Sequence, residues 1–345
     1  MEEKLLLAID DYNNEMINML QTLVNIDSNA DCPEGINKVA HVIGEFLLEL
    51  GFEVSYPEVP GVVTHIIAKR AGNAKNPKKI MMIGHMDTVF PKGTAEERPF
   101  SMDAEKAYGP GVLDMKSGIT IALYAVKSLI ETDLFENDIT IFFSGDEECA
   151  HQHSDAAKMY LDLAKDKDAV FNMETGADSG SVVLSRTGAY LPKIYVDGIA
   201  AHSGKDPQKG ASAIRELVFK LADLYRFADT DDNISFNAGI IRGGVAANGI
   251  AAHAEMEGDF RFKTVEAGPK IQAALQEICE KTYVPRTTTK LDYNPQKAYI
   301  PMERTQKNEW LYEIVHAQGK KLGIEIAAIG VGAGSDSCFT SCAGA

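Results

Sequence analysis

The stretch Ile80-Met81-Met82-Ile83-Gly84-His85-Met86-Asp87-Thr88 decides the fold that we expect for this chain. Its apolar first half is typical of a buried strand in a parallel sheet. In open α/β sheets the chemical groups gather at the carboxyl ends of such strands, which is where His85 and Asp87 emerge. Because strand side chains alternate, Asp87 points to the same side as His85. The pair is therefore either a buried hydrogen bond or a metal ligand with the carboxylate that orients it.

Three further segments place acidic side chains after apolar or glycine-rich stretches. They are Gly145-Asp146-Glu147-Glu148 after a predicted strand at 139–144, Glu174 after a predicted strand at 169–173, and Asp114 in the glycine-rich loop 107–118. Each alone also fits a solvated loop or a simple turn. Their occurrence together with His85 and Asp87 favours a metal site at one edge of the sheet.

Composition limits the class of protein and its partners. A chain of 345 residues is expected to form two domains. Its net charge of -16 argues against nucleic acid or an anionic membrane as a partner. The five cysteines are scattered and odd in number, which favours a reducing compartment over a disulfide framework. The first residues resemble neither a signal peptide nor a membrane span, so we expect a cytoplasmic protein.

The order of the predicted elements indicates an inserted domain. From about residue 188 the pattern becomes strand–helix–strand–strand–helix–strand, which is typical of a small ferredoxin-like α+β unit. Helical α/β patterning resumes after about residue 300. We therefore predict an α/β catalytic domain made of residues 1–187 and 297–345, which carries an inserted domain at residues 188–296.

Five motifs taken together resemble the M20 family of metallopeptidases, in particular its glutamate carboxypeptidase and tripeptidase-like branch. They are G-H-M-D-T at 84–88, Y-G-P-G-V-L-D-M-K-S-G at 108–118, S-G-D-E-E at 144–148, N-M-E-T-G at 172–176 and G-A-G-S-D at 332–336. The resemblance implies a zinc-exopeptidase-like catalytic domain with two zinc ions. It also implies an inserted ferredoxin-like lid domain through which the chain forms a homodimer. The mixed imidazole and carboxylate ligands would also suit cobalt or manganese.

The resemblance assigns roles to residues of the catalytic domain. Asp114 would bridge two metals, which would be completed by His85 and Glu174 on one side and Glu148 on the other. Glu147 would be the general base toward a metal-bridging water, with Asp87 assisting through His85. Family members also tend to have a cis peptide bond after the bridging aspartate.

The resemblance further implies substrate-binding residues. His202 would reach the active site of the partner subunit and hydrogen-bond the developing oxyanion. Asn248 and Arg261 would contact the carboxylate end of the substrate, and Gly334 and Ser335 would form a backbone cradle near it. By residue type alone, His202 also fits a capped surface histidine and Arg261 an exposed strand residue, and the stretch 332–335 fits a flexible loop.

The chain departs from the family pattern in three places. The family's last metal-ligand histidine lies beyond the Gly-Ser-Asp motif, whereas this sequence ends at Ala345. We therefore expect a truncated sequence, a substitute ligand or an impaired site. Cys149 to His153 replaces the small residues that usually follow the glutamate pair, and the pattern gives little support for His151 or His153 as ligands. Lys297 is a poor substitute for the arginine that recognises a glutamate side chain in folate-cleaving relatives.

Three functions stay open at this point. The first is a dimeric metal-dependent exopeptidase, acting as a carboxypeptidase or on small peptides, with Glu147 as general base. The second is a deacylase of N-acyl amino acids that uses the same metal chemistry. The third is an inactive or binding-only homologue, motivated by the missing histidine.

Overall fold

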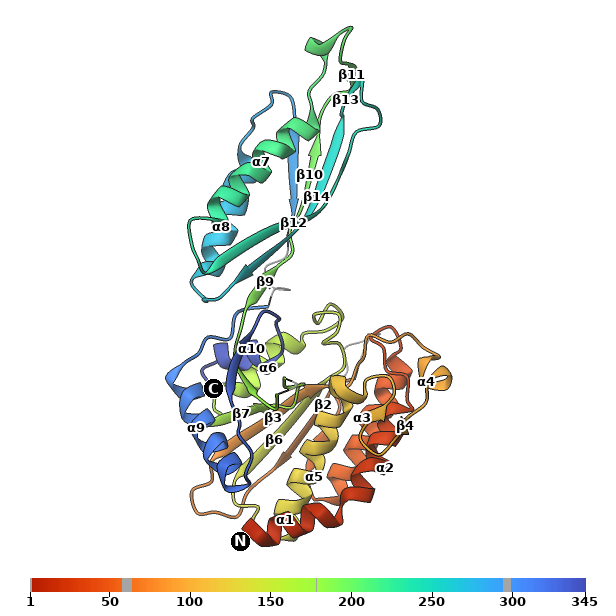
Figure 1. Ribbon diagram of the computed structural model, residues 1–345, viewed down its shortest axis with the longest axis vertical. Helices are drawn as coiled ribbons and strands as arrows, with labels where there is room; N and C mark the ends of the chain where they lie inside the picture. The colour runs from red at the N-terminus through yellow and green to blue at the C-terminus, as the bar shows by residue number, and fades with distance from the viewer. Residues whose placement is uncertain (1, 58–63, 178, 294–298) are drawn as a thin grey trace. The chain divides into compact units, whose positions relative to one another are not determined.

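The computed structural model describes residues 2–57, 64–177, 179–293 and 299–345. Figure 1 shows the chain coloured from red at the N-terminus to blue at the C-terminus. It divides into two compact units. The first comprises Met1–Val182, Gln306–Ala328 and Ser335–Ala345, and the second comprises Val183–Thr305 and Ile329–Gly334. The predicted boundary at 296–297 lies outside the described residues, as does the stretch with Lys297.

The first unit is built on a five-stranded sheet in the order β1-β2-β6-β3-β7. Its strands are β1 (Glu53–Ser55), β2 (Ile66–Arg70), β6 (Asp138–Ser144), β3 (Lys79–His85) and β7 (Ala169–Asn172). β3 pairs in parallel with both β6 and β7, whereas β2 runs antiparallel to β6. The carboxyl ends of the three parallel strands therefore lie at one edge of the sheet. The apolar run of β6 is buried along most of its length, as expected for a central strand.

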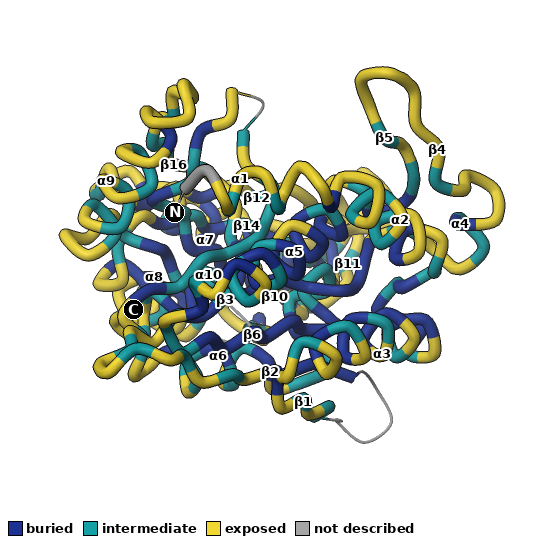
Figure 2. The backbone as a smooth tube through the Cα atoms, turned by 90° about the horizontal axis from the view of Figure 1, so that it is seen from below, coloured by how far each residue is buried: buried dark blue, intermediate teal, exposed yellow. Residues whose placement is uncertain are grey.

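Helices of the first unit lie around this sheet. They are α1 (Glu2–Asp11), α2 (Asn13–Val24), α3 (Pro33–Glu49), α4 (Thr94–Glu97), α5 (Ser117–Glu131), α6 (Ala156–Ala164), α9 (Gln306–Lys321) and α10 (Ser337–Cys342). α5 packs on β3, α3 packs on β1 and β2, and α10 packs on α6 and β7. Figure 2 shows β3 and β6 within the buried interior and α9 largely exposed.

The second unit is an antiparallel sheet with two helices. The sheet order is β12-β14-β10-β15, with β9 added beside β14. Its elements are β9 (Gly188–Tyr190), β10 (Lys193–Asp197), α7 (Ala213–Ala228), β12 (Ile234–Gly243), β14 (His253–Phe262), α8 (Ala267–Glu280) and β15 (Thr288–Asp292). Every second residue of β14 is buried, because one face of the sheet forms a core with α7 and α8. This confirms the predicted ferredoxin-like α+β fold.

The described residues also form several short elements. Three two-stranded sheets are formed by β4 (Ser101–Met102) with β5 (Ala107–Tyr108), β8 (Val182–Arg186) with β16 (Ala328–Val331), and β11 (Ala201–His202) with β13 (Gly249–Ile250). Val112–Lys116 forms an irregular turn in which Asp114 and Met115 are not helical, and Pro207–Lys209 forms a single turn of 3-10 helix. Within the described ranges, no helix combines the length and the apolar character needed to cross a membrane.

Candidate metal centre

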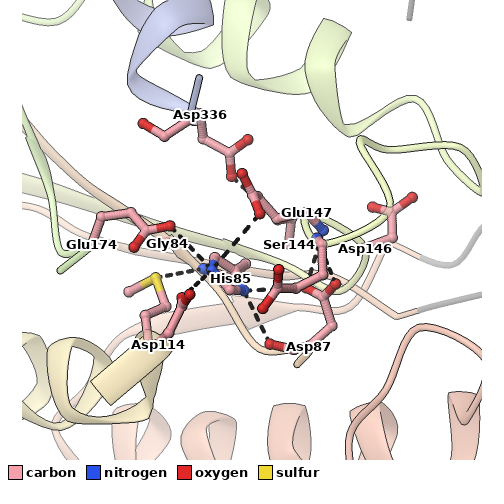
Figure 3. A network of polar contacts seen from close by, with 12 residues as sticks. Gly84, His85, Asp87, Asp114, Ser144, Asp146, Glu147, Glu174 and Asp336 are labelled. Atoms are coloured by element: carbon pink, nitrogen blue, oxygen red, sulfur yellow. Dashed lines mark hydrogen bonds and ion pairs between the residues drawn. The ribbon is translucent and has the colours of Figure 1, made fainter. Parts of the chain in front are cut away.

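His85 lies at the centre of the candidate site, at the carboxyl end of β3 (Figure 3). Its side chain is only 1% exposed. The neighbouring strands β6 and β7 end just before the Glu147–Glu148 pair and Glu174. Because both strands run parallel to β3, the sheet gathers on one edge the imidazole and the carboxylates that follow these strands in sequence.

Three of the predicted metal ligands form a compact cluster. The Nε2 atom of His85 lies 3.2 Å from Asp114 Oδ1 and 3.2 Å from Glu174 Oε1. One donor atom from each of the three residues lies within 4.8 Å of the other two. An imidazole with two carboxylates is a donor set that suits zinc, and also cobalt or manganese. The residues present therefore fit a divalent metal.

The loop before α5 brings Asp114 to this cluster. Gly111 has a φ of 69°, and a Cβ at this position would lie 2.5 Å from Thr88 Cγ2, so that glycine is required. The Asp114–Met115 peptide bond is cis, as the family resemblance implies. The sulfur of Met115 accepts the backbone N–H of His85 at 3.0 Å. The loop and the end of β3 are thus fixed to each other.

Asp87 connects His85 to the glutamate pair. The Nδ1 atom of His85 lies 3.0 Å from the backbone carbonyl oxygen of Asp87 and 3.4 Å from its Oδ1. The Asp87 carboxylate also accepts the backbone N–H groups of Glu147 at 3.0 Å and Glu148 at 2.9 Å. Asp87 therefore orients the ring so that Nε2 faces Asp114 and Glu174. The sequence did not indicate its second role, which is to hold the turn after β6.

The glutamate pair lies beside the cluster in a crowded acidic environment. Glu147 Oε2 is 3.9 Å from His85 Nε2, whereas Glu148 is not part of the donor cluster. Burial, and then the negative charge of Asp336, raise the pKa of Glu147 to about 8. Burial also raises the pKa of Glu148 to about 7, with a contribution from Asp114. Such like charges oppose one another unless a cation compensates them.

A second buried network adjoins the cluster, and the sequence did not predict it. His151 lies 3.2 Å from Asp146 through Nδ1 and 2.6 Å from Asp336 through Nε2. Figure 3 shows Asp146 and Asp336 on either side of Glu147. Neither His151 nor His153 belongs to the donor cluster. The only signal for this network was the histidine-containing departure from the family pattern.

The predicted substrate-binding residues are, with one exception, in the second unit. His202 is exposed, and its Nδ1 accepts the N–H of Gly204 at 3.1 Å. The backbone carbonyl of Asn248 accepts the hydroxyl of Ser203 at 3.0 Å. Arg261 on β14 donates from Nε to Asp259 at 2.8 Å. The structure thus gives each of these three residues a partner within its own unit, and their roles toward a substrate stay predictions.

The last predicted segment crosses between the two units. Gly334 belongs to the second unit and packs on Tyr299, where a Cβ would lie 2.5 Å from the ring. Ser335 belongs to the first unit, where it is buried, and its hydroxyl accepts the side-chain N–H of Asn172 at 3.0 Å. Their role as a substrate cradle also stays a prediction.

Comparison with known proteins identifies the family. Residues 184–287 match the family model of the M20 peptidase dimerisation domain. Carboxypeptidase G2 of Pseudomonas sp. (strain RS-16) is 30% identical over 288 residues, which cover 82% of this chain and 68% of that protein. The chain belongs to the M20 family of metallopeptidases. It is therefore a hydrolase of the peptidase and amidohydrolase type, as the motifs predicted.

Other M20 proteins extend the comparison. An acetylornithine deacetylase of Photorhabdus laumondii is 26% identical over 236 residues, which cover 64% of this chain and 59% of that enzyme. The crystal structure of aminopeptidase PepT from Bacillus cereus matches with a TM-score of 0.77 at 20% identity, covering 95% of this chain and 87% of that one. The structural similarity confirms the M20 fold class that the sequence predicted.

Proposed function

We propose that this M20 protein is a metal-dependent exopeptidase that hydrolyses an amide bond in a small peptide, with Glu147 as general base. The observation that carries the proposal is the cluster of His85, Asp114 and Glu174 with the Glu147 carboxylate beside it. The similarity to carboxypeptidase G2 over 82% of the chain supports a peptide-like substrate.

The cluster defines where metal would bind. His85, Asp114 and Glu174 would hold one divalent ion, and Asp114 with Glu148 would hold a second. We propose zinc for both, and the same donors would accept cobalt or manganese. Bound metal would polarise the scissile carbonyl and make water acidic enough to ionise near neutral pH.

The protein's own groups would position and move the proton. Glu147 would accept a proton from the attacking water and deliver it to the leaving amine, which requires a carboxylate close to the metal ligands. Asp87 supports this role because its carboxylate holds the backbone N–H groups of both Glu147 and Glu148. The base is thereby tied to the same residue that orients His85.

We further propose that the inserted domain, residues 188–296, forms a homodimer, since most of it matches a dimerisation domain. In that dimer His202 would stabilise the oxyanion in the partner's site. Asn248 and Arg261 would bind the substrate carboxylate, and Gly334 and Ser335 would form a backbone cradle near the substrate. The free cysteines support a reducing, cytoplasmic location.

A deacylase of N-acyl amino acids is the second candidate. It is favoured by the similarity to acetylornithine deacetylase over 64% of the chain. Both candidates share the metal ligands and the general base, so only the substrate distinguishes them.

The test is hydrolysis of matched dipeptides, tripeptides and N-acetyl amino acids by the zinc-loaded protein. We expect zinc-dependent peptide cleavage that falls by about 100- to 10,000-fold in Glu147→Gln, the usual range for losing a general base, with zinc content unchanged. The matched variant Glu148→Gln should lose zinc as well. Preferred cleavage of N-acetyl amino acids would instead establish the deacylase. No zinc-dependent turnover on any substrate would refute both and leave the binding-only alternative.

A further inference from the structure

A buried histidine lies behind the proposed base without belonging to the metal cluster. His151 is 5% exposed, and the two aspartates that flank its ring, Asp146 and Asp336, are 0% and 2% exposed. Asp146 immediately precedes Glu147, whereas Asp336 precedes helix α10. One imidazole therefore joins the turn after β6 to a segment 185 residues further along the chain.

The backbone at this histidine is held in an unusual conformation. Ala150 and His151 have φ values of 54° and 53°, in the left-handed region that costs an L-residue roughly 1–2 kcal/mol. Their N–H groups donate to the carbonyls of Glu147 at 2.7 Å and Asp146 at 2.9 Å. Strained residues persist only where their surroundings enforce them, and they gather at active sites. The turn therefore tolerates a strained backbone in the conformation that buries the His151 imidazole.

The aspartates place this imidazole next to the base. Asp146 is fixed by two further groups besides His151, because its carboxylate accepts hydrogen bonds from the His153 backbone N–H at 3.2 Å and the Ser154 hydroxyl at 2.9 Å. Figure 3 shows the Asp336 carboxylate pointing toward that of Glu147. The base therefore has one member of the network as its chain neighbour and the other facing its carboxylate.

Charge explains why a histidine suits this position. Two buried aspartates need a compensating cation, because an unpaired buried carboxylate is costly. Although burial alone would lower it, Asp336 and Asp146 raise the pKa of His151 to about 10. Two aromatic rings also lie beside the imidazole, Tyr160 at 5.9 Å and Phe339 at 5.8 Å between ring centroids.

We propose that His151 is a positioning residue for hydrolysis: by bridging Asp146 and Asp336 it fixes the carboxylate of Glu147 relative to the metal ligands. This inference rests on the proposed function, because that function makes Glu147 the base. His151 touches neither the metal donors nor a reacting atom. Its loss should therefore lower kcat, and leave KM and zinc content unchanged.

Two variants test this role. His151→Gln keeps a hydrogen-bonding side chain but removes the cation, which leaves two buried carboxylates uncompensated. The double variant His151→Gln/Asp336→Asn removes one negative charge together with the positive one, and so decides the question if the single variant does not fold. The control is His153→Gln in the same turn, where only the backbone N–H contacts Asp146.

The readouts are kcat, KM and zinc content on the peptide that the zinc-loaded wild type cleaves. We expect kcat to fall by about 10- to 100-fold in both His151 variants, since small displacements of a catalytic group have effects of this size. KM and zinc content should stay within about two-fold of wild type, and His153→Gln should retain wild-type kcat. An unchanged kcat in the folded double variant, or a loss confined to KM or zinc, would overturn the role of His151. An inactive wild type would instead refute the proposed function itself.

Discussion

His85 and His151 are two buried histidines with similar surroundings on one side and different surroundings on the other. Nδ1 of each ring faces an aspartate, Asp87 at 3.4 Å and Asp146 at 3.2 Å. Nε2 of His85 faces Asp114 and Glu174, both at 3.2 Å, and Asp114 is 54% exposed. Nε2 of His151 faces the single carboxylate of Asp336, which is 2% exposed.

This difference distinguishes a site that binds an external cation, around His85, from a site in which the imidazolium of His151 is itself the cation. Around His85, several carboxylates converge on one nitrogen and exceed the charge that one imidazolium could compensate. Around His151, one carboxylate lies on each side of the ring, and both are almost fully buried. The same pair of residue types therefore suits a metal centre where it is open and a fixed bridge where it is closed.

The largest expected effect is on the stability of the protein and follows from the loss of His151. His151→Ala leaves Asp146 and Asp336 buried without a cation, which should lower the free energy of unfolding by about 3–5 kcal/mol. The change in the midpoint of urea unfolding, recorded on the metal-free protein, measures this loss of stability. His253→Ala in the second unit is the control, because that histidine is exposed, and its midpoint should remain near that of the wild type. Equal midpoints for His151→Ala and wild type would show that the network contributes no net stability.

A smaller effect distinguishes the aspartates on the Nδ1 side. Asp87→Asn weakens the group that orients His85, and such substitutions usually lower metal affinity by about 10- to 100-fold. Asp146→Asn should leave zinc affinity within about three-fold of wild type, because Asp146 contacts His151 and not a metal donor. Competition titrations with a zinc chelator measure both. Equal losses in the two variants would contradict the separation of the two networks.

The fold could be predicted where the determining pattern is local. The apolar run before His85 defines β3, and the spacing of strands and helices after residue 188 defines the α+β unit. The pairing of β2 antiparallel to β6 has no such local signal. The chain also gathers His85, Asp114 and Glu174 as expected, because parallel strands and one glycine-rich loop bring them to the same edge.

The second network could not be predicted, for physical reasons. Its central contact joins residues 185 positions apart, between a turn and a short helix. Ala150 and His151 adopt positive φ values that a sequence would suggest only for glycine. The hydrogen bonds that Asp87 accepts from backbone N–H groups also cannot be predicted from residue types, because almost every residue carries such a group. The sequence indicated only that a histidine occupies a position where the family pattern has a small residue.

The smallest effect concerns a third histidine, paired with an aspartate at an exposed site. His253 Nδ1 lies 2.9 Å from Asp197, and the two side chains are 53% and 72% exposed. Its hydrogen bond to Asp197 raises the pKa of His253 above 6.5. A folded-state pKa above the unfolded value stabilises the fold below the unfolded pKa, and this contribution disappears as pH rises through the folded-state pKa. Solvent screening limits it to about 0.5 kcal/mol or less.

The comparison of wild type with His253→Gln in urea, at about pH 5.5 and about pH 8.5, tests this sign. The wild type should be slightly more stable at the lower pH, and the difference should vanish at the higher one. A difference that grows with pH would show that His253 is destabilised as a cation despite Asp197. The difference in burial would then not explain why the exposed His253–Asp197 pair contributes less stability than the buried histidine–aspartate pairs.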